Sequence, residues 1–235
     1  MTPKWNNPEY RITKNGEGMN NMEQARFNMI EQQIRPWDVA DARVLDLLSI
    51  VKREQFVPEG RQLLAFMDLE IPLGYGAYMW QPKQEARVLH ELNIQIGEHV
   101  LEVGTGSGYL TALLSRLAAQ ITSVEIVPEL SARAVHKLSA HQFNNIRLEV
   151  GDASNNWGSS KFDVIVLTGS VPVTPKAFQQ QLNVGGRLFA IVGDSPAMHA
   201  QIITRVSLEE YQSTTLFETS VLPLQNAPQP QRFVF

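Results

Sequence analysis

The most constraining feature of the chain is Val100–Tyr109, which reads Val-Leu-Glu-Val-Gly-Thr-Gly-Ser-Gly-Tyr. The apolar start predicts a buried strand, and the alternating glycines predict a turn whose backbone approaches a ligand closely. Leucines at positions 110, 113, 114 and 117 recur at helical spacing, so a helix follows the turn. A strand, a glycine turn and a helix in this order are typical of a nucleoside-cofactor site in an open α/β sheet.

Acidic residues accompany three successive predicted strands. Glu102 stands two residues before the first glycine, Glu125 ends a strand at Ile121–Val124, and Asp152 follows a strand at Arg147–Val150. The carboxyl ends of parallel strands meet at one edge of a sheet, so we expect these acids to share a site. Glu102 would take the ammonium of a zwitterionic ligand, Glu125 the ribose hydroxyls and Asp152 the adenine edge.

The acids also indicate which cofactor binds. The dinucleotide fingerprint Gly-x-Gly-x-x-Gly is not matched, because the third glycine comes one residue early and Tyr109 takes its place. Carboxylates repel phosphate groups but suit the positive sulfonium of S-adenosylmethionine. The pattern therefore favours S-adenosylmethionine over NAD, although a glycine-rich turn by itself is a weak signal.

Strands and helices alternate through the rest of the chain. This alternation predicts an α/β fold with a Rossmann-like, doubly wound and mainly parallel sheet, an antiparallel C-terminal edge and an N-terminal helical addition. Residues 53–82 read as irregular. Further helices are expected over 22–34, from Asp38 or Asp41 to Val51, over 83–92 and from Pro128. Further strands are expected over 162–167, over 187–192 after a Gly185-Gly186 turn, and in a hairpin of 201–206 with 213–222.

The domain organisation follows from the same pattern. Residues 1–21, rich in Asn, Lys, Gly and Pro, predict a flexible lead-in. Residues 22–92 are expected to form the N-terminal helical addition with an acceptor-site loop. Residues 93–235 are expected to form the Rossmann-like core.

Composition limits the classes of binding partner. The formal net charge is −4 with no dense basic run, which disfavours nucleic acid, and no apolar run is long enough to cross a bilayer. Cysteine is absent, which fits a cytoplasmic protein, and the five histidines do not fall at metal-ligand spacing. We therefore predict a cytoplasmic protein with no metal site and no membrane or nucleic-acid partner. The oligomeric state stays open.

Several segments together resemble one family. Arg53–Pro58 reads Arg-Glu-Gln-Phe-Val-Pro, Pro72–Gly76 reads Pro-Leu-Gly-Tyr-Gly, Gln81 precedes Pro82, and the glycine turn follows. In order and spacing this set is similar to the protein-L-isoaspartate O-methyltransferases, over roughly residues 22–224. The resemblance implies methyl transfer from S-adenosylmethionine to the free α-carboxylate of isoaspartyl residues in damaged proteins. Such a carboxylate is ionised at neutral pH, so no strong general base is required.

The acceptor-site segment departs from the family pattern. The family has Gly-x-Gly-Gln-Thr-Ile-Ser-Gln-Pro, whereas this chain has Ala77, Tyr78 and Trp80 where Gln, Thr and Ser are expected. Trp80 offers one donor and a large apolar face instead of a hydroxyl. Two alternatives therefore stay open: a methyltransferase of the same fold with another acceptor, such as a small molecule, or a cofactor-binding module without catalysis.

The predicted site combines strand-end geometry with this resemblance. The segment from Gly74 to Gln81 is expected to wall the acceptor pocket, and the residues facing the methyl group or the acceptor are Trp80 and Thr168. The residues expected to bind the cofactor are Glu102, Gly104, Thr105, Gly106, Ser107, Gly108, Glu125, Ile126, Gly151, Asp152 and Ala153.

Overall fold

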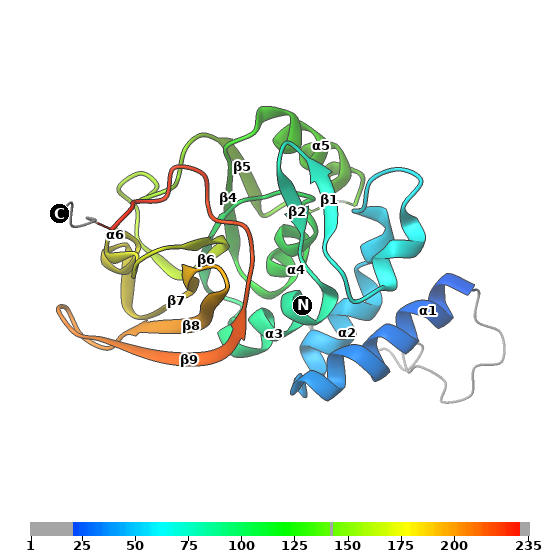
Figure 1. The fold of residues 1–235 in the computed structure, drawn as a ribbon, viewed down its shortest axis with the longest axis horizontal. Helices are drawn as coiled ribbons and strands as arrows, with labels where there is room; N and C mark the ends of the chain where they lie inside the picture. Colours follow the sequence, from blue (N-terminus) through cyan, green and yellow to red (C-terminus); the bar gives the residue numbers. More distant parts are fainter. Residues whose placement is uncertain (1–20, 142, 231–235) are drawn as a thin grey trace.

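A seven-stranded mixed sheet forms the centre of the molecule (Figure 1). The computed structural model describes residues 21–141 and 143–230. The strands of the sheet are β3 (His99–Val103), β4 (Gln120–Glu125), β5 (Ile146–Val150), β6 (Phe162–Val171), β7 (Leu182–Asp194), β8 (Ala197–Arg205) and β9 (Tyr211–Thr219). Their order is β5-β4-β3-β6-β7-β8-β9. The first five are parallel, and β8 and β9 continue the sheet antiparallel, which confirms the predicted fold class.

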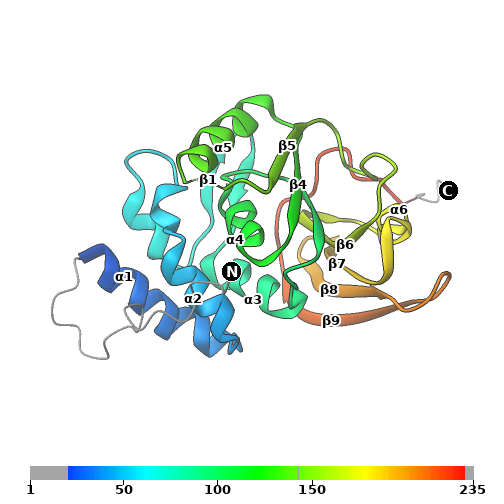
Figure 2. The same cartoon turned by 180° about the vertical axis from the view of Figure 1, so that it is seen from behind.

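Helices and short helical turns cover the sheet and extend it at the N-terminal side. Figures 1 and 2 show the first two helices at one end of the molecule and β7, β8 and β9 at the other. The helices are α1 (Asn21–Met29), α2 (Ala42–Ile50), α3 (Pro82–Leu92), α4 (Tyr109–Leu117), α5 (Pro128–Ala140) and α6 (Lys176–Gln180). After α1 the chain continues as a π-helical turn (Ile30–Ile34) and a 3₁₀ turn (Arg35–Trp37), and further 3₁₀ turns span Arg53–Gln55 and Gln62–Phe66.

Local signals explain where the predicted helices begin. The Asp41 carboxylate accepts a hydrogen bond from the Arg43 amide at 2.8 Å, so Asp41, one of the two expected residues, caps α2. Pro82 and Pro128 occupy first-turn positions of α3 and α5, where the missing N–H of proline removes no helical bond. The predicted lead-in, residues 1–21, lies outside the described residues except for Asn21, which begins α1.

The two faces of the sheet belong to two apolar clusters. Val100 of β3 packs on the side of α3, α4 and α5, whereas Leu101 and Val103 pack on the side of α6. The central strands are buried on both faces and therefore read as nearly continuous apolar runs. The second face is covered by the short α6 with Phe178, and by loop residues such as Ala227.

The strand order creates a crevice at the centre of the sheet. The chain builds β3, β4 and β5 outward in one direction and then returns to place β6 on the other side of β3. Connections leave β3 and β6 toward opposite sides at this switch point. In open α/β sheets ligands bind outside the carboxyl ends of the strands at such a point.

A β-hairpin corrects the prediction that residues 53–82 are irregular. Strands β1 (Ile71–Gly74) and β2 (Ala77–Met79) pair antiparallel around a turn. The turn is possible because Gly74, Tyr75 and Gly76 have φ values of 91°, 55° and 75°. The strands are too short for a clear alternation of apolar and polar residues, and Pro72 inside β1 argues against a strand. The sequence pattern therefore does not predict them.

Two central strands are longer than predicted. β6 runs to Val171, so Thr168 lies within this strand rather than after it. β7 begins at Leu182, and the Gly185-Gly186 pair lies inside it, at an irregularity in the register with β6. This corrects the prediction that the two glycines form a turn before the strand. The extra residues are accommodated as a bulge-like loop, because Phe162 pairs with Leu182 and pairing resumes with Arg187.

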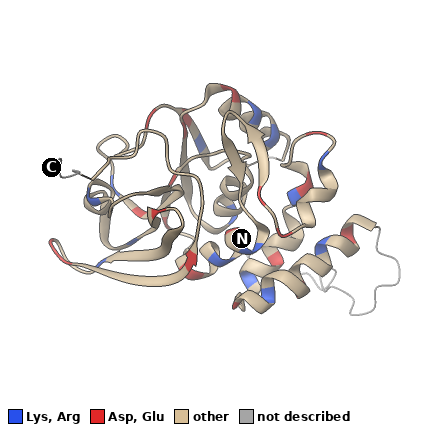
Figure 3. Cartoon of the chain, viewed as in Figure 1, with Lys and Arg blue, Asp and Glu red and all other residues tan. Residues whose placement is uncertain are grey.

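Within the described residues, 21–141 and 143–230, no helix is long and apolar enough to cross a membrane. Figure 3 shows basic and acidic positions interspersed over the helices and loops rather than gathered on one element.

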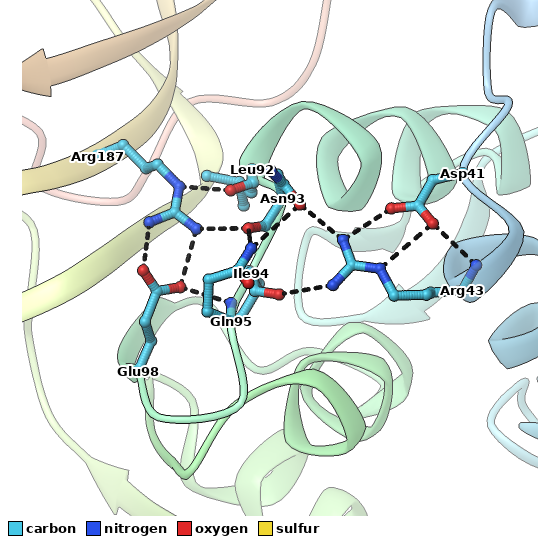
Figure 4. Close-up of polar contacts among 8 residues, drawn as sticks. All are labelled: Asp41, Arg43, Leu92, Asn93, Ile94, Gln95, Glu98 and Arg187. Carbon is cyan, nitrogen blue, oxygen red and sulfur yellow. Dashed lines mark hydrogen bonds and ion pairs between the residues drawn. The ribbon is translucent and has the colours of Figure 1, made fainter. Parts of the chain in front are cut away.

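The connection from α3 to β3 is clamped between two arginines (Figure 4). From β7, Arg187 donates to Glu98 at 2.6 Å and 2.8 Å, to the Asn93 carbonyl at 2.9 Å and to the Leu92 carbonyl. From the start of α2, Arg43 donates to the Asn93 side chain at 2.6 Å. The two guanidinium groups thereby fix the N-terminal helices against the central sheet.

We predict that Arg187→Ala lowers the free energy of unfolding by about 2 kcal/mol, because it removes the guanidinium that bonds the largely buried Glu98 carboxylate and the Leu92 and Asn93 carbonyls. Urea denaturation followed by far-ultraviolet circular dichroism measures this. The control is Arg147→Ala, which removes a mostly exposed arginine paired with Glu149 and is expected to change stability by less than about 0.5 kcal/mol. Equal effects of the two substitutions would contradict the clamp.

Candidate active site

A cavity of about 320 Å³ opens at the carboxyl ends of β3 and β6. The turn after β3, from Gly104 to Ser107, forms one wall, and Thr168 of β6 lies beside it. The β1–β2 hairpin with Trp80 forms the facing wall, and the C-terminal segment 221–225 closes a third side. A smaller adjoining cavity of about 40 Å³ shares Gly104 and Glu125 with it.

The first glycine of the turn is required by a close contact. Gly104 has a φ of 99°, and a Cβ at this position would lie 2.1 Å from the Thr168 Oγ1. The Thr168 hydroxyl lies 2.8 Å from the Val103 carbonyl oxygen and 2.9 Å from that of Gly104. Thr168 therefore lines the cavity, as predicted, but its hydroxyl proton is engaged by the backbone of the turn.

Glu125 joins the end of β4 to the glycine turn. Its carboxylate accepts hydrogen bonds from the Gly106 amide at 2.8 Å and from the Val127 amide at 3.0 Å. The side chain is buried yet borders both cavities. A carboxylate held in this way keeps free lone pairs for hydroxyl donors of a ligand. Its position agrees with the role that the sequence predicts.

Glu102 lies beneath the cavities. It is fully buried in β3 and borders neither of them, and its contact with a ligand ammonium stays a prediction. One carboxyl oxygen accepts from Thr111 at 2.5 Å and from Ser123 at 2.6 Å, and Ser123 also bonds the Thr105 hydroxyl at 2.6 Å. Burial raises the pKa of Glu102 to about 8, so the group is largely neutral at pH 7. Glu102 thus supports the turn from below.

Gly108 also lies outside the two cavities. It stands at the start of α4. A Cβ at this position would lie 3.3 Å from the Ala134 Cβ and 3.5 Å from Leu138 on α5. The third glycine therefore allows α4 and α5 to pack closely.

The remaining predicted cofactor residues border the two cavities. Thr105, Gly106, Ser107 and Ile126 line the larger one, as does Trp80, and Gly151, Asp152 and Ala153 line the smaller one. Hydrogen bonds from the Ser154 amide and from Asn226 lower the pKa of Asp152. The bond to Asn226 draws the C-terminal loop toward the predicted adenine side.

The acceptor side of the cavity is built around a buried arginine. Arg53 is fully buried and donates to Glu85 at 2.9 Å, to the Ala65 carbonyl at 2.8 Å and to the Trp80 carbonyl. Its guanidinium also lies over the Tyr109 ring, 5.7 Å from the centroid. Burial raises the pKa of Glu85 to about 7 although Arg53 opposes that shift. The Trp80 ring packs edge-on against Phe189 at 6.1 Å.

Sequence reasoning missed several residues of the cavity wall, among them Glu70, Glu85 and segment 221–225. Arg53 and Glu85 are 32 positions apart and belong to different elements, so no local pattern links them. Glu70 directly precedes a strand that the pattern did not reveal.

The charge of the cavity has one sign. Among the described residues that line the two cavities, Glu70, Glu85, Glu125 and Asp152 are acidic, and none is Lys, Arg or His. In the part of the chain that the structure describes, no group of three or more His, Asp or Glu side chains is arranged to hold a metal ion. The cavity therefore suits a ligand with a positive group and without phosphate.

This sheet, with a glycine turn at its switch point and an acidic cavity above it, defines a Rossmann-like methyltransferase of class I. The family model "Protein-L-isoaspartate(D-aspartate) O-methyltransferase (PCMT)" matches residues 24–228. The chain belongs to the protein-L-isoaspartate O-methyltransferase family.

Relatives and solved structures agree with this assignment. The chain is 35% identical to the protein-L-isoaspartate O-methyltransferase 2 of Marinobacter nauticus, over 91% of this chain and 97% of the relative. It is 39% identical to an Anaeromyxobacter protein-L-isoaspartate O-methyltransferase 1, over 72% of this chain and 81% of the relative. One solved structure is a Plasmodium falciparum protein described as a protein-L-isoaspartate O-methyltransferase, in complex with S-adenosyl-L-homocysteine. It superimposes on this chain with a TM-score of 0.74 at 18% identity, and the match covers 88% of this chain and 99% of that protein. That likeness shows the shared fold.

We predict that Glu102→Gln changes how stability depends on pH. The pKa of Glu102 rises from 4.5 to about 8 on burial, so the folded state holds its proton more tightly than the unfolded state. The native protein should therefore lose stability as the pH rises from about 4.5 to about 8, by up to about 1.4 kcal/mol per pH unit for this one group. The variant lacks this contribution.

Urea denaturation at pH 5, 6, 7 and 8 measures the effect. The stability of Glu102→Gln relative to the native protein should rise over this range, whereas Glu209→Gln, at an exposed position, should run parallel to the native protein. Parallel curves for both variants would mean that Glu102 is ionised in the folded state.

Proposed function

We propose that the chain transfers a methyl group from S-adenosylmethionine to the carboxylate of isoaspartyl residues in proteins. The match to the family over residues 24–228 supports the choice of acceptor. The choice of cofactor is supported by the cavity at the switch point, which is lined by carboxylates and by no cationic side chain among the described residues.

The residues of the cavity fit S-adenosylmethionine, which supplies an electrophilic methyl group on a positive sulfonium. The backbone of Gly104–Ser107 would border its methionine end, and Glu125 would accept hydrogen bonds from the ribose hydroxyls. Gly151, Asp152 and Ala153 would border the adenine in the smaller cavity. A Cβ on Gly106 would come within 3.3 Å of Leu73, so a glycine keeps this wall open toward the hairpin.

The acceptor half requires positioning rather than acid–base catalysis. An isoaspartyl carboxylate is ionised at neutral pH, and the protein must align one of its oxygens with the methyl–sulfur bond and exclude water. Trp80 lines the cavity, and its indole N–H has no hydrogen-bond partner among the described residues. We infer that this N–H donates to the acceptor carboxylate, and that Thr168 borders the transferred methyl.

A different acceptor is the second candidate. Trp80 carries no hydroxyl, and its ring, only 6% exposed, occupies the wall where the family resemblance predicts a serine. That bulk favours an acceptor smaller than a protein segment. The predicted cytoplasmic location stays a prediction.

Replacement of Glu125 tests the cofactor site. Glu125→Ala removes the acceptor for the ribose hydroxyls and two bonds that shape the turn, so the Kd for S-adenosylhomocysteine should rise at least about tenfold. Isothermal titration calorimetry measures the affinity. The control is Glu129→Ala at the exposed start of α5, which should bind like the native protein. Native affinity in Glu125→Ala would exclude the proposed ribose contact.

Transfer of labelled methyl to peptides tests the acceptor. We expect the native protein to label a peptide with one isoaspartyl residue and to leave its aspartyl twin unlabelled. Trp80→Phe keeps the apolar ring but lacks the N–H, so kcat/KM should fall about tenfold or more. Trp37→Phe, whose ring packs on Phe217, is the matched control and should keep native activity.

The opposite results have distinct meanings. Native activity in Trp80→Phe would exclude the indole N–H as the donor. An inactive native protein that gains isoaspartyl methylation in Trp80→Ser would favour the second candidate, in which Trp80 shapes the site for another acceptor.

A further inference from the structure

Glu70 differs from the other carboxylates of the larger cavity because its side chain has no partner among the described residues. Glu125 accepts from two backbone amides, and Glu85 is paired with Arg53. Glu70 lines the same cavity and is half-buried, yet it makes no hydrogen bond or ion pair with any described residue. A carboxylate in this setting is free to bind a group from outside the chain.

Three basic side chains of the described residues contact the hairpin region, and each bonds a group other than Glu70. Lys83 forms an ion pair of 2.7 Å with Asp68, and Asp68 lies two positions before Glu70. Arg61 donates to the Pro72 carbonyl at 3.4 Å, and Arg133 donates to the Leu73 carbonyl at 3.2 Å. The fold thus brings cations near the hairpin without neutralising Glu70.

The register of the hairpin places Glu70 on the acceptor side of the cavity. Ile71 pairs with Met79 in the antiparallel ladder, so one step further Glu70 stands across from Trp80. Both residues line the cavity. A peptide whose carboxylate reaches Trp80 therefore brings a neighbouring side chain close to Glu70.

The charges determine which neighbour is favourable. Burial without a compensating partner raises the pKa of Glu70, so a cation at this point would stabilise its ionised form. The acceptor carboxylate adds a second negative charge to a wall that lacks cationic side chains among its described residues. A positive group on the substrate offsets both charges, whereas a negative one adds to them.

We propose that Glu70 is a specificity-determining residue that selects isoaspartyl segments with a Lys or Arg side chain next to the modified residue. The isoaspartyl part of this statement rests on the proposed function. The charge selection rests on Glu70 alone.

Three short isoaspartyl peptides that differ only in the neighbouring residue test the proposal: one with Lys, one with Gln and one with Glu. The readouts are KM and kcat for methyl transfer and, separately, the Kd of each fluorescently labelled peptide in the presence of S-adenosylhomocysteine, by anisotropy. For the native protein we expect KM and Kd for the Lys peptide to be about threefold lower than for the Gln peptide, and those for the Glu peptide to be higher. The differences should shrink at about 0.5 M salt.

Substitutions assign the preference to Glu70. Glu70→Gln should bring the three KM values together, and Glu70→Lys should reverse their order. Glu59→Gln removes one negative charge from an exposed position outside the cavity and should keep the native order.

The two readouts separate this proposal from the proposed function. If peptides are methylated with no dependence on the neighbouring charge, or if Glu70→Gln keeps the native order, the role of Glu70 is excluded while the isoaspartyl activity stands. If no peptide is methylated but the Kd values keep the order, the activity fails and the charge selection stands. Equal binding of the three peptides, or binding of none, overturns the proposal.

Discussion

The buried guanidinium of Arg53 holds the acceptor half of the cavity together. Removing an ion pair from water costs several kcal/mol per ion, and only complete hydrogen bonding offsets that cost. Arg53 reaches this state with partners from three segments: Glu85 on α3, the Ala65 carbonyl in a 3₁₀ turn, and the Trp80 carbonyl after the hairpin. One side chain therefore fixes three elements relative to one another, and it makes the N-terminal region part of the site rather than an appendage.

The cofactor half depends on backbone geometry instead. Gly104 leaves room for Thr168, and the Gly106 amide donates to Glu125 at the end of the neighbouring strand β4. Glu102 supports this turn as a largely neutral acid beneath it. The two halves meet where Leu73 of the hairpin approaches Gly106. The result is a cavity with an apolar indole on one side and carboxylates around it, which is consistent with a cationic, phosphate-free cofactor.

Much of the fold could be predicted because its signals are local. Apolar runs predicted the parallel strands, Asp41 and Pro128 predicted helix starts, and the position of Glu125 at a strand end predicted its place in the cavity. Prediction was wrong where the outcome depends on distant contacts. The surroundings of a strand-end acid also depend on distant contacts, since Glu102 is held beneath the turn by Thr111 and Ser123. The short strands around the glycine turn were not predicted, since strands of four and three residues give too little periodicity.

The sequence by itself determined the class of fold, the glycine turn and the family, because periodicity, turn chemistry and motif spacing are properties of neighbouring residues. Only the tertiary structure decided which acids face the cavity and which are neutralised. Glu70, Glu85 and Glu102 are the same residue type. Glu70 has no partner in the part of the chain that the structure describes, Glu85 is paired with a buried arginine, and Glu102 is buried beneath the turn. Charge state and accessibility arise from groups that folding brings together from far along the chain, so no local pattern contains them.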